Sequence, residues 1–172
     1  TATVQITDED LPPTISVADN TSSEGDGSIS FTVSLDNASE KDLSVSYTTS
    51  ALGATAETSD FTATAGTLNF PAGTVTQTFS VPLNDDTTDE DDETFIVMLG
   101  DHQNVTKGSD NNAIGTIQDN DNGPTISIAD VNTTNELGAN QTLTVVLSEI
   151  SEKTVQVQYQ TLDGTALANV DY

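Results

Sequence analysis

Apolar and polar residues alternate in short runs along most of the first 121 positions. The clearest runs carry an apolar side chain at every second residue: Ile29, Phe31, Val33 and Leu35; Leu43, Val45 and Tyr47; and Phe95, Val97 and Leu99. A period of two is typical of a β-strand with one buried face, whereas no stretch shows the 3.6-residue period of an amphipathic helix. We therefore predict almost no helix, and strands near residues 14–18, 28–36, 42–49, 66–70, 75–83, 93–100 and 113–118.

Turn-forming residues separate these runs. Examples are the stretches Glu24–Gly27, Pro71–Gly73 and Lys107–Asn112. About seven short strands in about 110 residues, joined by such turns, are typical of an immunoglobulin-like sandwich. The predicted fold class is thus all-β, built of tandem antiparallel β-sandwiches of this kind.

The chain repeats itself. Residues 13–19 read Pro-Thr-Ile-Ser-Val-Ala-Asp, and residues 124–130 read Pro-Thr-Ile-Ser-Ile-Ala-Asp. After a one-residue insertion the match continues, with Ser39-Glu-Lys41 facing Ser151-Glu-Lys153. Backwards, Ile6–Asp10 matches Ile117–Asp121. Strand and turn residues that recur in order over this length indicate duplication.

The repeat predicts three parts. We interpret residues 1–12 as the last strand and exit loop of a preceding repeat, and residues 13–121 as one complete repeat. Residues 122–172 are then the first half of a following repeat, which lacks the strands that would complete its core. Such a half-domain is expected to be poorly stable by itself.

Composition adds a strong electrostatic constraint. The chain carries 28 acidic residues against 3 lysines and no arginine, for a formal net charge of -25. Nucleic acid is therefore a poor partner, because almost nothing here neutralises phosphates. The chain has no cysteine and no apolar run long enough to insert into a membrane. Divalent cations are the natural partners of such a chain, and an acidic, solubilising surface is the alternative.

The acids are concentrated in one stretch, which we call the acidic loop. Residues 85–93 hold seven carboxylates in nine positions, between two apolar strands. Further acids follow predicted strands at Asp119 and Asp121, and Glu24 lies in an early interstrand loop. The loops of a sandwich cluster at its two ends, and its up-and-down course can bring these three to the same end. Ca²⁺ takes 6–8 oxygen ligands from carboxylates and carbonyls, which such a cluster would supply. A solvated acidic run without metal remains the alternative interpretation.

Several segments, taken together, resemble the Calx-beta domain. They are Ser59-Asp-Phe61, Gly66–Phe70, Phe79–Leu83, Asn84-Asp-Asp86, Asp89–Phe95 and Gly115–Asp121. The resemblance covers residues 13–121, most of 122–172 and the tail at 1–10. It implies a seven-stranded sandwich that binds calcium in loops at one end, as in sodium–calcium exchangers, an integrin tail and large bacterial surface proteins.

The resemblance also implies a ligand set, carried over residue by residue. The implied calcium ligands are Glu24, Asp60, Asp85, Asp86, Thr88 (through its backbone carbonyl), Glu90, Glu93, Asp119 and Asp121. Asn120 replaces an acid of the family pattern, which is expected to weaken or remove one ion. For the flanking repeats only fragments remain, among them Asp8, Glu136 and Asp171.

The expected function is that of a calcium-rigidified structural repeat of an extracellular surface, adhesin or filament protein. Its expected partners are calcium ions, neighbouring repeats and other copies or cell-surface ligands. A cytosolic calcium sensor of the exchanger type and a metal-free acidic spacer are the alternatives. Catalysis is not expected, because the carboxylates lie in a charge run without tryptophan, and the single histidine, His102, is interpreted as a surface loop residue.

Overall fold

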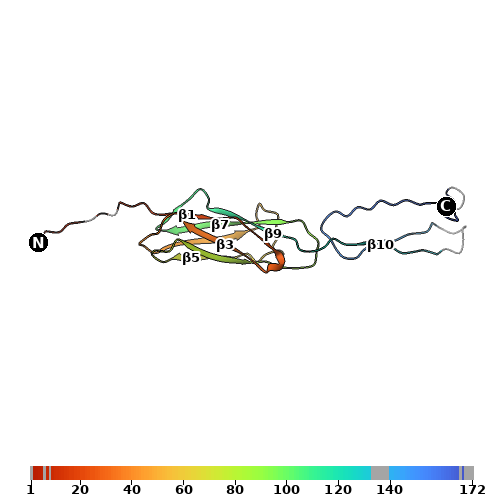
Figure 1. Ribbon diagram of the computed structural model, residues 1–172, viewed down its shortest axis with the longest axis horizontal. Helices are drawn as coiled ribbons and strands as arrows, with labels where there is room; N and C mark the ends of the chain where they lie inside the picture. Colours follow the sequence, from red (N-terminus) through yellow and green to blue (C-terminus); the bar gives the residue numbers. More distant parts are fainter. Residues whose placement is uncertain (1, 6, 8, 133–139, 167, 169–172) are drawn as a thin grey trace. The chain divides into compact units, whose positions relative to one another are not determined.

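A computed structural model describes residues 2–5, 7, 9–132, 140–166 and 168 (Figure 1). The chain divides into two compact units. The first unit comprises residues 1–86 and 92–120, and the second comprises residues 87–91 and 121–172. Among the described residues, no helix is long and apolar enough to cross a membrane.

The first unit is a sandwich of two sheets. One sheet has the strand order β6-β3-β1-β8, and the other has the order β2-β9-β7-β4-β5. The strands are β1 (Thr14–Val17), β2 (Asn20–Ser23), β3 (Ser28–Leu35), β4 (Leu43–Ser50), β5 (Ala65–Phe70), β6 (Thr76–Pro82), β7 (Glu93–Gln103), β8 (Thr106–Lys107) and β9 (Asn112–Gln118). The predicted all-β class and all seven predicted strands are confirmed.

Two strands were not expected, and each forms a parallel pair in a mostly antiparallel fold. The first segment of the domain changes sheets after Val17, so β1 pairs with β3 and β8, whereas β2 pairs with β9. The side chain of Asp19 accepts a hydrogen bond from the Ile114 backbone N–H at 2.7 Å at this crossing. The β2 sequence Asn-Thr-Ser-Ser has no apolar alternation, so its pattern gave no strand signal.

The core lies between the inner faces of the two sheets. The alternating residues Ile29, Phe31, Val33 and Leu35 of β3 are all buried, as are Phe95, Val97 and Leu99 of β7. The phenylalanine rings join the two faces: Phe31 stacks on Phe79 at a centroid distance of 5.5 Å and meets Phe95 edge-on at 5.9 Å. The strand period read from the sequence therefore identifies the residues that hold the sandwich together.

Gly115 leaves room for the ring of Phe95. The two residues face each other across β7 and β9, and a Cβ atom at position 115 would lie 2.4 Å from Cζ of Phe95. Gly115→Ala is therefore expected to lower the free energy of unfolding by about 1–3 kcal/mol through overpacking. Urea denaturation of the two proteins measures this loss. The same change in a Phe95→Leu background should cost clearly less, and an equal cost in both backgrounds would show that the ring is not responsible.

In the second unit, the described strands are β10 (Ile126–Ile128) and β11 (Val145–Leu147), which pair antiparallel. Its apolar side chains are largely exposed: Ile128 is 58 % exposed and Val157 is 52 % exposed. In the first unit, by contrast, the corresponding alternating residues are buried. The low stability expected for residues 122–172 stays a prediction.

Candidate metal centre

Glu24 is the most buried carboxylate of the site. It opens a single 3-10 turn, Glu24–Asp26, between β2 and β3, and its side chain is only 4 % exposed. The turn closes through the hydrogen bond from Gly27 N–H to the Glu24 carbonyl at 3.0 Å. Gly27 has a φ of 72°, a left-handed conformation that glycine adopts without steric cost. The Glu-Gly-Asp-Gly sequence thus turns the chain sharply and holds Glu24 in place.

Parallel pairing of β2 with β9 brings Glu24 beside Asp119. The last pair in register is Ser23 with Gln118, and Glu24 and Asp119 are the residues that follow. The backbone N–H of Asn120 donates a hydrogen bond to Oε1 of Glu24 at 3.4 Å. Because parallel strands end at the same edge of a sheet, acids placed directly after each strand must meet.

The acidic loop reaches the same end of the first unit. The Asn120 side chain donates a hydrogen bond to Oδ1 of Asp85 at 3.0 Å, and the Asp119 N–H donates one to Oδ1 of Asp92 at 3.3 Å. Gly25 makes this approach possible, since a Cβ there would lie 2.3 Å from Nδ2 of Asn120. The early loop, the acidic loop and the exit of β9 therefore converge, an arrangement that the sequence alone left open.

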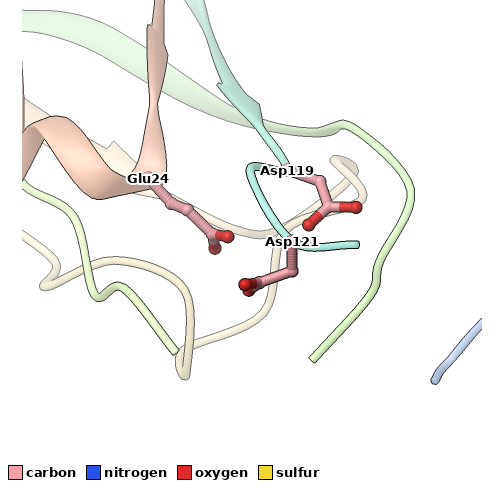
Figure 2. Close-up of side chains that lie close together, drawn as sticks. All are labelled: Glu24, Asp119 and Asp121. Carbon is pink, nitrogen blue, oxygen red and sulfur yellow. The ribbon is translucent and has the colours of Figure 1, made fainter. Parts of the chain in front are cut away.

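Glu24, Asp119 and Asp121 form the first group of carboxylates, which we call the Glu24 group (Figure 2). One carboxylate oxygen from each lies within 4.8 Å of the others. Figure 2 shows the Glu24 side chain extending from the 3-10 turn toward the residues that follow β9. Glu24 is buried, and Asp119 and Asp121 are partly buried.

A second group, the Asp60 group, consists of Asp60, Glu90 and Glu93, whose oxygens also lie within 4.8 Å of one another. All three side chains are partly buried. Burial alone would raise the pKa of Asp60, but hydrogen bonds with the side chains of Glu93 and Ser59 and with the Glu57 backbone lower it overall. Asp60 is consequently ionised at neutral pH.

Packing explains why Asp60 and Glu93 are neighbours. The Thr94 N–H donates a hydrogen bond to the Thr55 hydroxyl at 2.7 Å, so the segment before Asp60 runs along the start of β7. Phe61 then stacks on Phe95 at a centroid distance of 4.5 Å. Phe61 follows Asp60 by one residue, and Phe95 follows Glu93 by two. The stacked rings therefore hold the two carboxylates close to each other. Phe61 is therefore a core residue.

The two groups have the ligand chemistry of a hard cation. Every member offers carboxylate oxygen, and neither group contains histidine, which favours Ca²⁺ over Zn²⁺ or other metals that prefer nitrogen and sulfur. Two like charges 4 Å apart repel by about 1 kcal/mol in water and by about 4 kcal/mol near a protein surface. A cation placed among three carboxylates at such distances would offset this repulsion.

The remaining residues implied by the resemblance lie outside these two groups. Asp85 and Asp86 are exposed in the acidic loop, and Thr88 is partly buried there. Asp8, Glu136 and Asp171 lie outside the described residues. His102 is exposed but belongs to the end of β7, so its expected placement in a loop is wrong: the strand continues to Gln103 because Ser44 and Val45 of β4 pair with it.

Sequence reasoning did not single out Asp89, although it lies in the middle of the acidic loop. Its side chain is only 7 % exposed, and its carboxylate forms a salt bridge with Lys153 at 2.6 Å. The sequence did contain a hint that an acid would pair with Lys153. The chain has only three lysines, and two of them, Lys41 and Lys153, occupy matching positions of the repeat.

An immunoglobulin-like sandwich with carboxylate-rich loops gathered at one end defines a class of cation-binding β-domains. The model of one family, described as the Calx-beta domain, matches residues 8–121 and 119–172. The chain therefore belongs to the Calx-beta family, whose members are calcium-binding β-sandwiches, and contains two copies of its domain. No curated protein sequence matches the chain.

Solved structures agree with this membership. The apo form of the Calx CBD1 domain is 26 % identical, with a TM-score of 0.58, over 63 % of this chain and 98 % of that one. The calcium-binding domain CBD12 of CALX1.1 is also 26 % identical, with a TM-score of 0.59, over 67 % of this chain and 50 % of that one. The Calx CBD2 domain, at 15 % identity and a TM-score of 0.56, supports the fold alone.

Proposed function

We propose that the chain binds calcium at one end of its complete domain and serves as a calcium-rigidified structural repeat of an extracellular surface, adhesin or filament protein. The observation that carries the calcium proposal is the buried Glu24 beside Asp119 and Asp121. A buried carboxylate near two others is costly unless a cation compensates it. The proposed ligands are the Glu24 group and the Asp60 group, with Asp85, Asp86 and the Thr88 carbonyl completing the coordination.

The structural role is supported by the way the ligands are distributed along the chain. Glu24 follows β2, Asp119 and Asp121 follow β9, and the proposed next repeat, residues 122–172, begins directly afterwards. A cation held by these residues would restrain the segment that leads out of the domain. Tandem domains, 3 cationic residues in 172 and no cysteine favour an extracellular array over a cytosolic sensor.

Calcium is expected to raise the melting temperature of the first unit by roughly 5–15 °C relative to chelator. For a dissociation constant near 10⁻⁴–10⁻³ M, 10 mM calcium gives about 1.4–2.7 kcal/mol of stabilisation by mass action. Near-ultraviolet circular dichroism of tyrosine measures the transition. Tyr47 stacks on Phe79 at 3.9 Å in the first unit, whereas Tyr159 is 91 % exposed.

Magnesium at the same concentration is the matched control and should give a much smaller shift, because Mg²⁺ demands octahedral geometry and dehydrates reluctantly. Identical melting temperatures in calcium and in chelator would contradict the calcium proposal and favour a metal-free acidic spacer. Half-saturation near 10⁻⁷–10⁻⁵ M would instead favour the cytosolic sensor.

A further inference from the structure

The contact around Asp89 shows how an acidic loop meets the start of a following repeat. Residues 87–91 belong by sequence to the repeat 13–121 but cluster with the second unit. Ser151 donates a hydrogen bond to Oδ2 of Asp89 at 2.7 Å, and Lys153 Nζ lies 2.6 Å from Oδ1. The Glu152 N–H donates to the Asp89 carbonyl at 3.0 Å. Both oxygens of the carboxylate and its own backbone carbonyl are thus engaged by three consecutive residues.

The three residues form a turn that recurs in the first unit. In the second unit, the Lys153 N–H donates to the Ser151 hydroxyl at 3.1 Å. In the first unit, the Lys41 N–H donates to the Ser39 hydroxyl at 3.0 Å. We call both segments, 39–41 and 151–153, the Ser-Glu-Lys turn. The sequence and this hydrogen bond are the same in both, so the first unit carries the same hydroxyl and ammonium groups.

A cavity of about 380 Å³ lies over the first of these turns. Its lining includes Asp10, Pro12, Ser39, Glu40, Lys41 and Asn104, so it holds one cation beside two acidic residues. Pro12 occupies the repeat position of Gly123, which lies beside Asp89. A Cβ at position 123 would lie 3.3 Å from Oδ2 of Asp89, so an aspartate docked against Pro12 has to sit a few tenths of an ångström farther out. The residues that surround Asp89 in the second unit therefore have counterparts that line one cavity in the first unit.

We propose that this cavity is the docking site for the aspartate of an acidic loop, equivalent to residues 87–91, from a preceding Calx-beta repeat. The aspartate accepts hydrogen bonds from Ser39 and pairs with Lys41, and its carbonyl accepts from the Glu40 N–H. Charge supports this occupant: two of the three cations of a chain with net charge -25 stand at this one repeat position. The proposed contact between repeats is an ion pair with hydrogen bonds and needs no metal. It is therefore a separate interaction from the proposed calcium binding.

The test uses a chain in which residues 1–116 are followed directly by residues 6–172, so that Ile6 stands where Ile117 stands and the cavity keeps its lining. Because the protein has no cysteine, no native thiol competes with an introduced pair, and dilute protein limits disulfides between molecules. Asp89→Cys in the first copy and Ser39→Cys in the second copy should form a disulfide under mild oxidation in chelator, at least about tenfold faster than the control pair Asp91→Cys and Ser39→Cys. The pair Asp89→Cys and Ser151→Cys in the original chain gives the reference rate.

A second measurement does not depend on cysteine. In the extended chain, Asp89→Asn in the first copy and Lys41→Gln in the second copy should together lower the melting temperature no more than either alone, since both break one interaction. Asp89→Asn combined with Lys107→Gln should be additive. The proposal is overturned by a disulfide rate equal to that of the Asp91 control, or by additivity of Asp89→Asn with Lys41→Gln. Both readouts are made without calcium, so their failure is independent of the calcium proposal.

Discussion

Phe95→Ala is expected to lower the free energy of unfolding of the first unit by about 3–5 kcal/mol, a large part of the ~5–15 kcal/mol that stabilises a typical domain. The Phe95 ring is fully buried, stacks on Phe61 at 4.5 Å and meets Phe31 edge-on at 5.9 Å. Alanine removes these contacts and leaves a cavity that Gly115, on the facing strand, cannot fill. The midpoint of urea unfolding measures the loss.

Met98→Ala on the same strand is the matched control, because Met98 is 39 % exposed and its truncation should cost below about 1 kcal/mol. Phe95→Ala should also reduce the calcium-dependent gain in stability, because Phe95 and Phe61 hold Glu93 and Asp60 side by side. Similar losses for Met98→Ala and Phe95→Ala would contradict the assigned core.

Glu24→Gln is expected to lower the calcium affinity by at least about tenfold while leaving the calcium-free protein as stable as before, or more stable. Glutamine keeps the length of the side chain and an oxygen that accepts the Asn120 hydrogen bond. It removes one of three negative charges held within 4.8 Å, and calcium affinity depends on the number of charged ligands. Melting curves of both proteins over a series of calcium concentrations give the two effects.

Asp101→Asn removes the same charge from an exposed position of β7 and serves as the control. It should leave the calcium dependence unchanged, because screening at ordinary salt weakens interactions between distant exposed charges. A calcium response of Glu24→Gln equal to that of Asp101→Asn would remove the Glu24 group from the proposed site.

Most of the fold was predictable because its strands have one buried face. The period of two in β3, β4 and β7 identifies both the strands and their core residues. The strands β2 and β8 were not predicted because neither buries a side chain completely, so neither has an alternating apolar pattern. They form by pairing with β9 and β1, and such long-range pairing leaves no local pattern in the sequence. For the same reason, the sequence did not predict that β1 and β2 would belong to different sheets.

The acidic residues that meet at one end of the first unit were recognisable in the sequence, but their arrangement was only partly predictable. The density of acids in residues 85–93 indicates a cation, but it does not say which acids meet. Glu24 and Asp119 meet because β2 and β9 run parallel, a pairing that no local pattern reveals. Asp89 lies in the same run and yet pairs with Lys153, a difference between neighbouring acids that composition does not reveal.

The parallel pairing of β2 with β9 also determines how the domain resists being pulled. Four consecutive pairs, from Asn20 with Gly115 to Ser23 with Gln118, join the N-terminal region of the domain to its last strand. When opposite ends of the polypeptide are drawn apart, two parallel strands slide along each other, and all their hydrogen bonds bear the load in shear. Antiparallel hairpin strands pulled from their open end would instead unzip one bond at a time. The carboxylates that follow Ser23 and Gln118 stand at the end of this mechanical clamp, where a shared cation would add its ligand bonds to those that have to break.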